Sequence, residues 1–170
     1  MVKNMEFLDK CIIRKAMPND LKSIQALEYE CFPPLERASG EMVCARFNAF
    51  MENFIVCEYD SKVIGFINGS LTNETTLYDY LYHDIKYHNP NGKIFAMFGL
   101  DVKADFRRKG IARALLNALI EDCKKRGLAG IILTCKDHLV EFYKSVGYKH
   151  LGVSVSNHGN AKWNDMELIF

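Results

Sequence analysis

The sequence predicts an α/β fold, with a mixed, mostly antiparallel β-sheet and helices on both of its faces. In the second half of the chain, apolar strand-like runs alternate with amphipathic helical segments, as they do in α/β units. Pairs of strand-like runs joined by short polar turns predict antiparallel hairpins on either side of that region. The length of 170 residues suits one domain with a substantial core. We therefore expect a single domain over residues 1–170, with a loose leader at residues 1–9.

The first half of the chain has the patterns of a strand, two helices and a hairpin. Pro18 opens the first helix, and Asn19 or Asp20 can cap it. Ser39 can cap the second helix through its hydroxyl group. The polar turn Asp60-Ser61 joins two β-type runs into the hairpin. The expected elements are a strand at residues 10–15, helices at 18–31 and from residue 40, and strands at 54–59 and 62–71.

The second half of the chain contains the most regular patterns. A nearly continuous apolar run at residues 93–102 indicates a strand that is buried on both faces. The clearest helix covers residues 110–126, because its apolar residues recur at spacings of three and four and Gly127 follows it. The other expected elements are a short helix or ordered loop at 78–88, a strand at 130–136, a short helix at 139–146, and strands at 148–155 and 161–170.

Composition and charge exclude several classes of function. A formal net charge of +1 argues against a general binder of nucleic acids or membrane surfaces. No run approaches the roughly 18 apolar residues of a membrane span, and MVKNMEFLDK lacks the apolar core of a signal peptide. The cysteines form neither a C-x-x-C pair nor a zinc-like cluster, so we expect reduced thiols, no bound metal and a cytoplasmic protein. They are Cys11, Cys31, Cys44, Cys57, Cys123 and Cys135.

The segment DFRRKGIARALL, residues 105–116, has the composition of a phosphate-binding turn between a strand and a helix. The first N–H groups of a helix lack intrahelical partners, and the helix dipole adds positive charge there, which suits a phosphate. Gly110 has no side chain to hold a phosphate away, and Ala112 keeps the next turn slim. The turn lacks the G-x-G-x-x-G and G-K-[ST] patterns of other phosphate-binding motifs. The cations around it are Arg107, Arg108, Lys109 and Arg113.

This turn resembles the R/Q-x-x-G-x-G/A signature of the GNAT superfamily of acetyl-CoA-dependent N-acetyltransferases. The matching residues are RRKGIA, and they follow the strand-like run that ends in LDV. In that family, the backbone of the turn holds the pyrophosphate of coenzyme A, and the preceding strand pairs with the pantetheine arm. The resemblance implies a pantetheine site at Leu100, Asp101 and Val102. It implies a pyrophosphate site at Arg108, Lys109, Gly110, Ile111, Ala112 and Arg113.

A second segment, CKDHLVEFYKSVGY at residues 135–148, resembles the narrower arylalkylamine N-acetyltransferase group. That group has the pattern C-x-D-x-L-V-x-F-Y, followed by a glycine and an aromatic residue. GFINGS at residues 65–70 is similar to its third strand, and Phe32 and Pro33 fall near its substrate-binding first loop. The resemblance implies a GNAT-like fold, acetyl-CoA as cosubstrate, a small amine as acceptor, and acceptor contacts from Phe32 and Pro33.

Tyr143 lies in this second segment, and the chemistry of acetyl transfer has a role for it. Amine attack on a thioester expels a thiolate, which benefits from a positioned proton donor. A tyrosine side chain with a pKa of about 10 is neutral at pH 7 and can donate that proton. In the resembling family, the corresponding tyrosine lies beside the sulfur of coenzyme A and acts as general acid. We therefore predict Tyr143 as the acid and as part of the cosubstrate site, the alternative being a tyrosine packed in its own helix.

The sequence departs from the vertebrate arylalkylamine enzymes at the proton acceptor. Two histidines that serve in proton removal there correspond here to Ala96 and Phe98. Aliphatic amines are mostly protonated near neutral pH, so a route for that proton is still required. Asp101, the nearest carboxylate on the same strand, could order a water, or water alone could serve as the base. Exposed carboxylates near the expected acceptor entrance could attract a cationic amine, and they are Glu28, Glu30 and Glu36.

Three functions follow from these observations. The leading hypothesis is transfer of an acetyl group from acetyl-CoA to a primary amine, a small aryl- or alkylamine. A lid formed by residues 78–88 would favour such small acceptors, whereas an open groove would favour a protein N-terminus or a lysine. The third is a module that binds acetyl-CoA without turnover. We expect a small-molecule partner, no nucleic acid or membrane, and a monomer or a homodimer paired through the edge of the last strand, residues 161–170.

Overall fold

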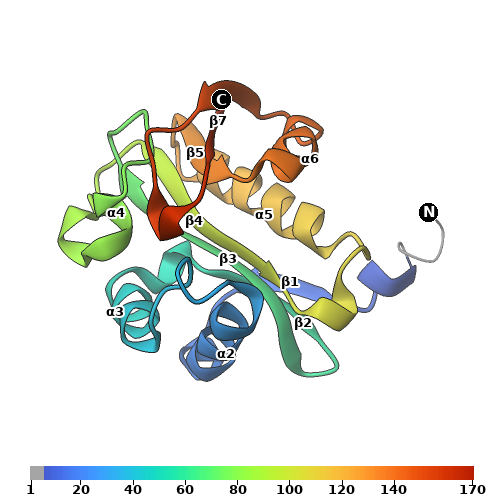
Figure 1. Cartoon of the computed structure of the whole chain (residues 1–170). Coiled ribbons are helices and arrows are strands. Elements are labelled where there is room, and N and C mark those ends of the chain that lie inside the picture. The colour runs from blue at the N-terminus through green and yellow to red at the C-terminus, as the bar shows by residue number, and fades with distance from the viewer. Residues whose placement is uncertain (1–5) are drawn as a thin grey trace. The chain divides into compact units, whose positions relative to one another are not determined.

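The computed structural model describes residues 6–170 and contains the mixed, mostly antiparallel sheet that the sequence predicts (Figure 1). Its strands in this range are β1 (Ile12–Lys15), β2 (Ile55–Tyr59), β3 (Lys62–Thr72), β4 (Ile94–Val102), β5 (Gly130–Cys135), β6 (Lys149–Val153) and β7 (Asn164–Ile169). They hydrogen-bond in the order β1-β2-β3-β4-β5-β7-β6. β4 and β5 run parallel, whereas β1–β2, β2–β3, β5–β7 and β6–β7 are antiparallel.

The helices also lie close to where the sequence places them. Ser39 caps α3 (Gly40–Phe50) as predicted, because its hydroxyl accepts the N–H of Met42 at 3.1 Å. Residues 78–88 are ordered as one short helix, α4, followed by the 3₁₀ turn Ile85–Tyr87. Within residues 6–170, no helix is long and apolar enough to cross a membrane. The α-helices used below are α2 (Leu21–Cys31), α3 (Gly40–Phe50), α4 (Tyr80–His83), α5 (Ile111–Lys125) and α6 (Val140–Lys144).

The chain divides into two compact units, and each is made of two separate stretches of sequence. Unit 1 comprises Met1–Asn68 and Gly99–Leu119, and unit 2 comprises Gly69–Phe98 and Ile120–Phe170. The chain therefore passes from one unit to the other inside β3, β4 and α5, without a separate linker. The turn with the GNAT-like signature belongs to unit 1, and the segment that contains Tyr143 belongs to unit 2.

In unit 1, helices lie against both faces of the sheet. Phe66 of β3 packs into the core that α2 and α3 form on one face. Its neighbour Gly65 points the other way, because successive side chains of a strand alternate between faces. A Cβ atom at Gly65 would lie 3.4 Å from both Ile111 and Leu115 of α5, so α5 covers this second face. The buried residues of the first face are Ala16, Ile24, Leu27, Val43, Phe47, Phe50, Phe54, Val56 and Phe66.

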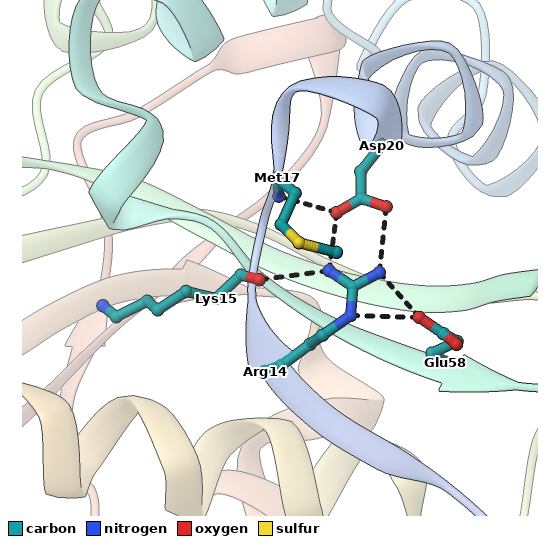
Figure 2. Close-up of polar contacts among 5 residues, drawn as sticks. All are labelled: Arg14, Lys15, Met17, Asp20 and Glu58. Carbon is teal, nitrogen blue, oxygen red and sulfur yellow. Dashed lines mark hydrogen bonds and ion pairs between the residues drawn. The ribbon is translucent and has the colours of Figure 1, made fainter. Parts of the chain in front are cut away.

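Arg14 ties three segments of unit 1 together (Figure 2). Its guanidinium group donates to both carboxylate oxygens of Asp20, at 2.7 and 3.1 Å, and to Oε2 of Glu58 on β2 at 2.7 Å. Asp20 also accepts the N–H of Met17 at 2.7 Å, which stabilises the start of the turn that leads into α2. The hydrogen bonds from Arg14 lower the pKa of Asp20, although burial of this carboxyl group acts in the opposite direction.

In unit 2, β7 lies between two strands and is not an edge. It pairs with β5 on one side and with β6 on the other, so the prediction that the last strand offers a free edge is wrong. β6 forms the edge instead. The exposures agree with this order, because β7 buries Asn164 and Met166 whereas β6 exposes Leu151 and Val153. The core cluster beside these strands contains Leu77, Leu81, Ile94, Ala96 and Ile132.

Candidate functional site

The turn between β4 and α5 has the backbone geometry expected of an anion-binding turn. β4 ends at Val102, a 3₁₀ turn follows at Ala104–Phe106, and α5 begins at Ile111. Gly110 has a φ of 88°, in the left-handed region that favours glycine. Arg108 has a φ of 61°, which is uncommon for a residue with a side chain and marks a constrained backbone. The sequence predicts the need for Gly110, but it gives no signal for the strained Arg108.

The first turn of α5 contains backbone N–H groups that lie before the first intrahelical hydrogen bond. Ala114 donates to the carbonyl oxygen of Gly110 at 3.0 Å, which closes the first helical hydrogen bond. The N–H groups of Ile111, Ala112 and Arg113 precede that bond, so they belong to the set that an intrahelical carbonyl does not satisfy. The helix dipole adds partial positive charge at the same place. A phosphate group is the ligand that such an arrangement favours.

The basic side chains of the turn serve different purposes. Nε of Arg107 donates to the carbonyl oxygen of Val102 at 2.9 Å and so ties the turn to the end of β4. The ammonium group of Lys109 lies 4.8 Å from the ring centroid of Phe7 and 5.6 Å from that of Phe106. It therefore makes cation–π contacts, which the interpretation of Lys109 as a charge on the rim of a phosphate site does not predict.

The N-terminal segment packs against the same turn. Residues 1–5 of the expected leader lie outside the described residues. Within the rest of that leader, the ring of Phe7 lies 4.8 Å from that of Tyr59, measured between centroids. A Cβ atom at Gly110 would lie 3.0 Å from Cδ1 of Leu8. Phe7 and Leu8 therefore contribute to the surroundings of the turn.

Two candidate residues from the sequence, Glu28 of α2 and Asp101 of β4, come together in unit 1. Their exposed fractions are only 6% and 2%, so the expectation of an exposed carboxylate at Glu28 is wrong. The Glu28 carboxylate accepts the N–H of Ala38 at 2.7 Å and acts on Asp101 of β4. Burial, and then the neighbouring Glu28 carboxylate, raise the pKa of Asp101 well above its usual range. Glu30 is exposed and Glu36 is half-buried.

The predicted acceptor loop begins where α2 ends. Phe32 follows α2 directly in an extended conformation, and Pro33 is exposed. A Cβ atom at Gly99 of β4 would lie 3.5 Å from the Phe32 ring, so glycine allows this ring to approach the strand. The thiol of Cys31 donates to the carbonyl oxygen of Val102 at 3.6 Å. Unit 1 thus brings the predicted acceptor residue Phe32 close to the strand that carries the predicted pantetheine contacts.

Tyr143 lies in α6 of unit 2 and is 5% exposed. Its ring packs edge-on against Phe142 and Tyr148, with centroids 5.3 and 5.6 Å away. The hydroxyl oxygen of Tyr148 is buried and has no hydrogen-bond partner within residues 6–170. Burial, and next the neighbouring Tyr143, raise the pKa of Tyr148 well above its usual range. Aromatic packing therefore fixes the orientation of the Tyr143 ring.

A polar network that sequence reasoning did not identify supports the turn before α6. Asp137 accepts hydrogen bonds from Asn164 at 2.7 Å and from Lys162 at 3.2 Å. The buried Asn164 amide also contacts the ring of His150, whose Nε2 lies 3.0 Å from its Oδ1. These hydrogen bonds lower the pKa of Asp137. The aspartate of the C-x-D-x-L pattern thus anchors the segment that carries Tyr143 to β7.

The fold and the turn define a class of α/β domain that binds a phosphate-containing ligand. β4, α5 and β5 form a parallel βαβ unit, and in such units ligands bind beyond the carboxyl end of the strand. Residues 21–148 match the family model described as "Acetyltransferase (GNAT) family". This match covers more than half of the sequence. The chain therefore belongs to the GNAT acetyltransferase family. Within residues 6–170, no group of three or more His, Cys, Asp or Glu side chains is arranged to hold a metal ion.

Two curated proteins are similar to the chain over part of their length. "Probable hydrolase YhcX" of Bacillus subtilis (strain 168) is 27% identical over 136 residues, which are 75% of this chain and 26% of that protein. "N-acetyltransferase 8" of Homo sapiens is 28% identical over 104 residues, which are 59% of this chain and 40% of that protein. The chain thus spans less than half of the length of either relative.

Solved structures share the fold over nearly the whole chain. The loading GNATL domain of CurA from Lyngbya majuscula has a TM-score of 0.81 at 13% identity, with 94% of this chain and 97% of that one covered. The GphF GNAT-like decarboxylase in complex with isobutyryl-CoA has a TM-score of 0.75 at 17% identity, with 93% and 98% covered. Arabidopsis thaliana Naa50 in complex with the bisubstrate analogue CoA-Ac-MVNAL has a TM-score of 0.72 at 18% identity, with 95% and 99% covered.

Proposed function

We propose that this chain is an N-acetyltransferase that transfers the acetyl group of acetyl-CoA to a primary amine. The observation that carries the proposal is the turn at Gly110, whose positive φ and position before α5 suit a pyrophosphate. Membership of the GNAT family supports acetyl-CoA as the cosubstrate. The similarity of residues 135–148 to the arylalkylamine group supports a small aryl- or alkylamine as the acceptor.

The cosubstrate site in this proposal is built from backbone groups of unit 1. The N–H groups of Ile111, Ala112 and Arg113 bind the pyrophosphate, and Arg108 and Lys109 complete the turn that positions them. The backbone of Leu100, Asp101 and Val102 pairs with the pantetheine arm. Acetyl-CoA supplies an activated acyl group as a thioester. Phe32 and Pro33 contribute to the acceptor side.

Tyr143 is the proton donor to the departing thiolate in this proposal. We expect Tyr143→Phe to lower kcat roughly 100-fold, a typical loss when a general acid is removed, and to leave acetyl-CoA binding unchanged. Steady-state kinetics with a reactive amine and calorimetric titration of acetyl-CoA measure the two effects. Tyr148→Phe is the matched control, since it removes the hydroxyl group of a ring that packs on Tyr143. Equal kcat values for Tyr143→Phe and the unaltered chain would remove Tyr143 from the reaction.

The acceptor is best identified by a product screen. The chain is incubated with acetyl-CoA and a panel of arylalkylamines, alkylamines, peptides with free N-termini and lysine peptides, and products are detected by mass spectrometry. We expect the small amines to give the highest kcat/KM. Acetylation confined to peptides would indicate the protein N-terminus or lysine alternative. Measurable acetyl-CoA binding without any product would indicate a module that binds the cosubstrate without turnover.

A further inference from the structure

Glu28 and Asp101 form a buried pair of carboxyl groups that the proposed cosubstrate contacts and Tyr143 do not explain. Glu28 comes from α2 and Asp101 from β4, and both belong to unit 1. The end of α2 lies against the last part of β4, since the Cys31 thiol donates to the carbonyl oxygen of Val102 and Gly99 adjoins the Phe32 ring. At this junction the Glu28 carboxyl acts on Asp101 as a like charge. Oδ2 of Asp101 is buried and has no hydrogen-bond partner within residues 6–170. Two adjacent carboxylates away from water cannot both be ionised at low cost, so this geometry favours one shared proton.

One cation, one carboxylate and one thiol lie around the carboxyl group of Asp101. Arg107 is the cation that acts on Asp101, but its Nε is already bonded to the carbonyl oxygen of Val102. Cys31 is a neutral thiol, because burial, and then the charge of Asp101, raise its pKa to about 11. Glu30 adds a further negative charge near Cys31. These surroundings therefore favour one shared proton on the pair over two ionised carboxylates.

The pair also lies between the two parts of the proposed site that unit 1 contains. Asp101 is flanked on β4 by Leu100 and Val102, whose backbone is proposed to pair with pantetheine. Glu28 lies in the last turn of α2, and this helix leads directly into Phe32 and the proposed acceptor loop. The pair therefore lies near the place where both acetyl-CoA and the amine are proposed to bind.

We propose that Glu28 and Asp101 together accept the proton that the ammonium form of the acceptor must lose before it attacks acetyl-CoA. The inference rests on the proposed function. An N–H bond of the ammonium group breaks and an O–H bond forms on the pair, with an intervening water carrying the proton. The neutral amine forms the new C–N bond as the C–S bond breaks, and Tyr143 protonates the thiolate. The acylated nitrogen releases a second proton through water, which restores the hydroxyl group of Tyr143, and the pair releases its proton to solvent.

The test compares Glu28→Gln and Asp101→Asn, which keep the shape of each side chain and remove its charge. We expect each variant to lower kcat/KM for the amine roughly 100-fold near neutral pH, the typical loss for a proton-transfer group. We also expect the acid limb of the pH profile of kcat/KM to shift or disappear, while the acetyl-CoA affinity changes little. Asp20→Asn is the control, because this buried carboxylate of unit 1 is ion-paired with Arg14 at the opposite end of α2 from Glu28. It should retain the acid limb.

A second readout requires no turnover. Infrared spectroscopy of the unaltered chain near neutral pH should detect a protonated carboxyl group, and Asp101→Asn should remove its band. Product formation with an unchanged acid limb in both variants, or absence of that band, would overturn the inference about the pair and leave the proposed function intact. If the unaltered chain gives no product with any amine or peptide, the proposed function fails, and the role of the pair in that reaction fails with it.

Discussion

At the scale of single residues, the turn at Gly110 is determined by backbone conformation more than by side-chain charge. Gly110 and Arg108 both adopt positive φ, which bends the chain sharply before α5 begins. Arg107 holds this bend through its bond to Val102, and Lys109 packs on aromatic rings. The sequence predicts the role of Gly110, because a glycine directly before a helix indicates a positive φ or the close approach of a ligand to the backbone. It cannot predict which cation serves structure, since that depends on Phe7 and on the carbonyl of Val102.

Gly110→Ala tests this interpretation against a second positive-φ glycine. At Gly110 a methyl group forces a strained backbone and approaches Leu8 at 3.0 Å, so we expect a loss of roughly 1–2 kcal/mol in the free energy of unfolding. Gly127 has a φ of 69° and nothing within 4 Å of its Cβ position, so Gly127→Ala should cost about 1 kcal/mol through backbone strain alone. Chemical denaturation measures both losses.

Affinity for acetyl-CoA separates the two substitutions. We expect Gly110→Ala to weaken binding at least about tenfold, equivalent to roughly 1.4 kcal/mol, because the N–H groups of the turn are displaced. Gly127→Ala should leave the dissociation constant unchanged, since it alters the opposite end of α5. Calorimetric titration of each variant gives this constant directly. Equal affinities for the two variants would show that the turn at Gly110 does not contact the cosubstrate.

At the scale of elements, polar side chains determine junctions that hydrophobic patterns leave open. Periodicity predicts α5 and β4 well because their apolar residues face a continuous core. It predicts neither the contact of Glu28 with Asp101 nor the network of Asp137 and Asn164, because each joins residues far apart in sequence. The predicted position of the last strand at a free edge is wrong for the same reason. The apolar pattern of residues 161–170 indicates a strand, but which strands pair with it depends on where β6 folds.

The Arg14 junction gives the stability of the chain a defined dependence on pH. The pKa of Asp20 is lowered in the folded state, so its ionised form stabilises the fold above the unfolded pKa of about 4. That contribution is lost as the pH falls through the lowered folded-state pKa. We expect Asp20→Asn to cost about 2 kcal/mol at pH 7, typical of a hydrogen bond to a charged partner, and progressively less below about pH 4.

Urea unfolding of this variant over a range of pH measures the effect. Glu52→Gln is a suitable control, because Glu52 is an exposed carboxylate in the same unit and its change should stay within about 0.5 kcal/mol. A cost for Asp20→Asn that remained constant down to the most acidic pH at which the fold survives would contradict the assignment of this pH dependence to Asp20.

At the scale of the whole molecule, the sequence predicts the set of elements but not how the chain distributes them between compact units. Each unit combines two distant stretches, and the divisions fall inside β3, β4 and α5. A pattern of local periodicity cannot reveal such a division, because each of these elements is regular across it. Neither unit is a continuous piece of sequence. Each unit therefore needs both of its stretches before it can be complete.

Because the two units are interleaved in sequence, we propose that residues 1–170 behave as one cooperative domain. Two native probes report on the units separately. Trp163, the single tryptophan, lies in unit 2, and the buried thiol of Cys57 lies in unit 1. We expect tryptophan fluorescence and thiol labelling of Cys57 to give the same urea midpoint, because melting β3, β4 or α5 removes part of both units at once. Separate midpoints would mean that each unit keeps its fold without the other, and the chain would then contain two domains built from interleaved sequence.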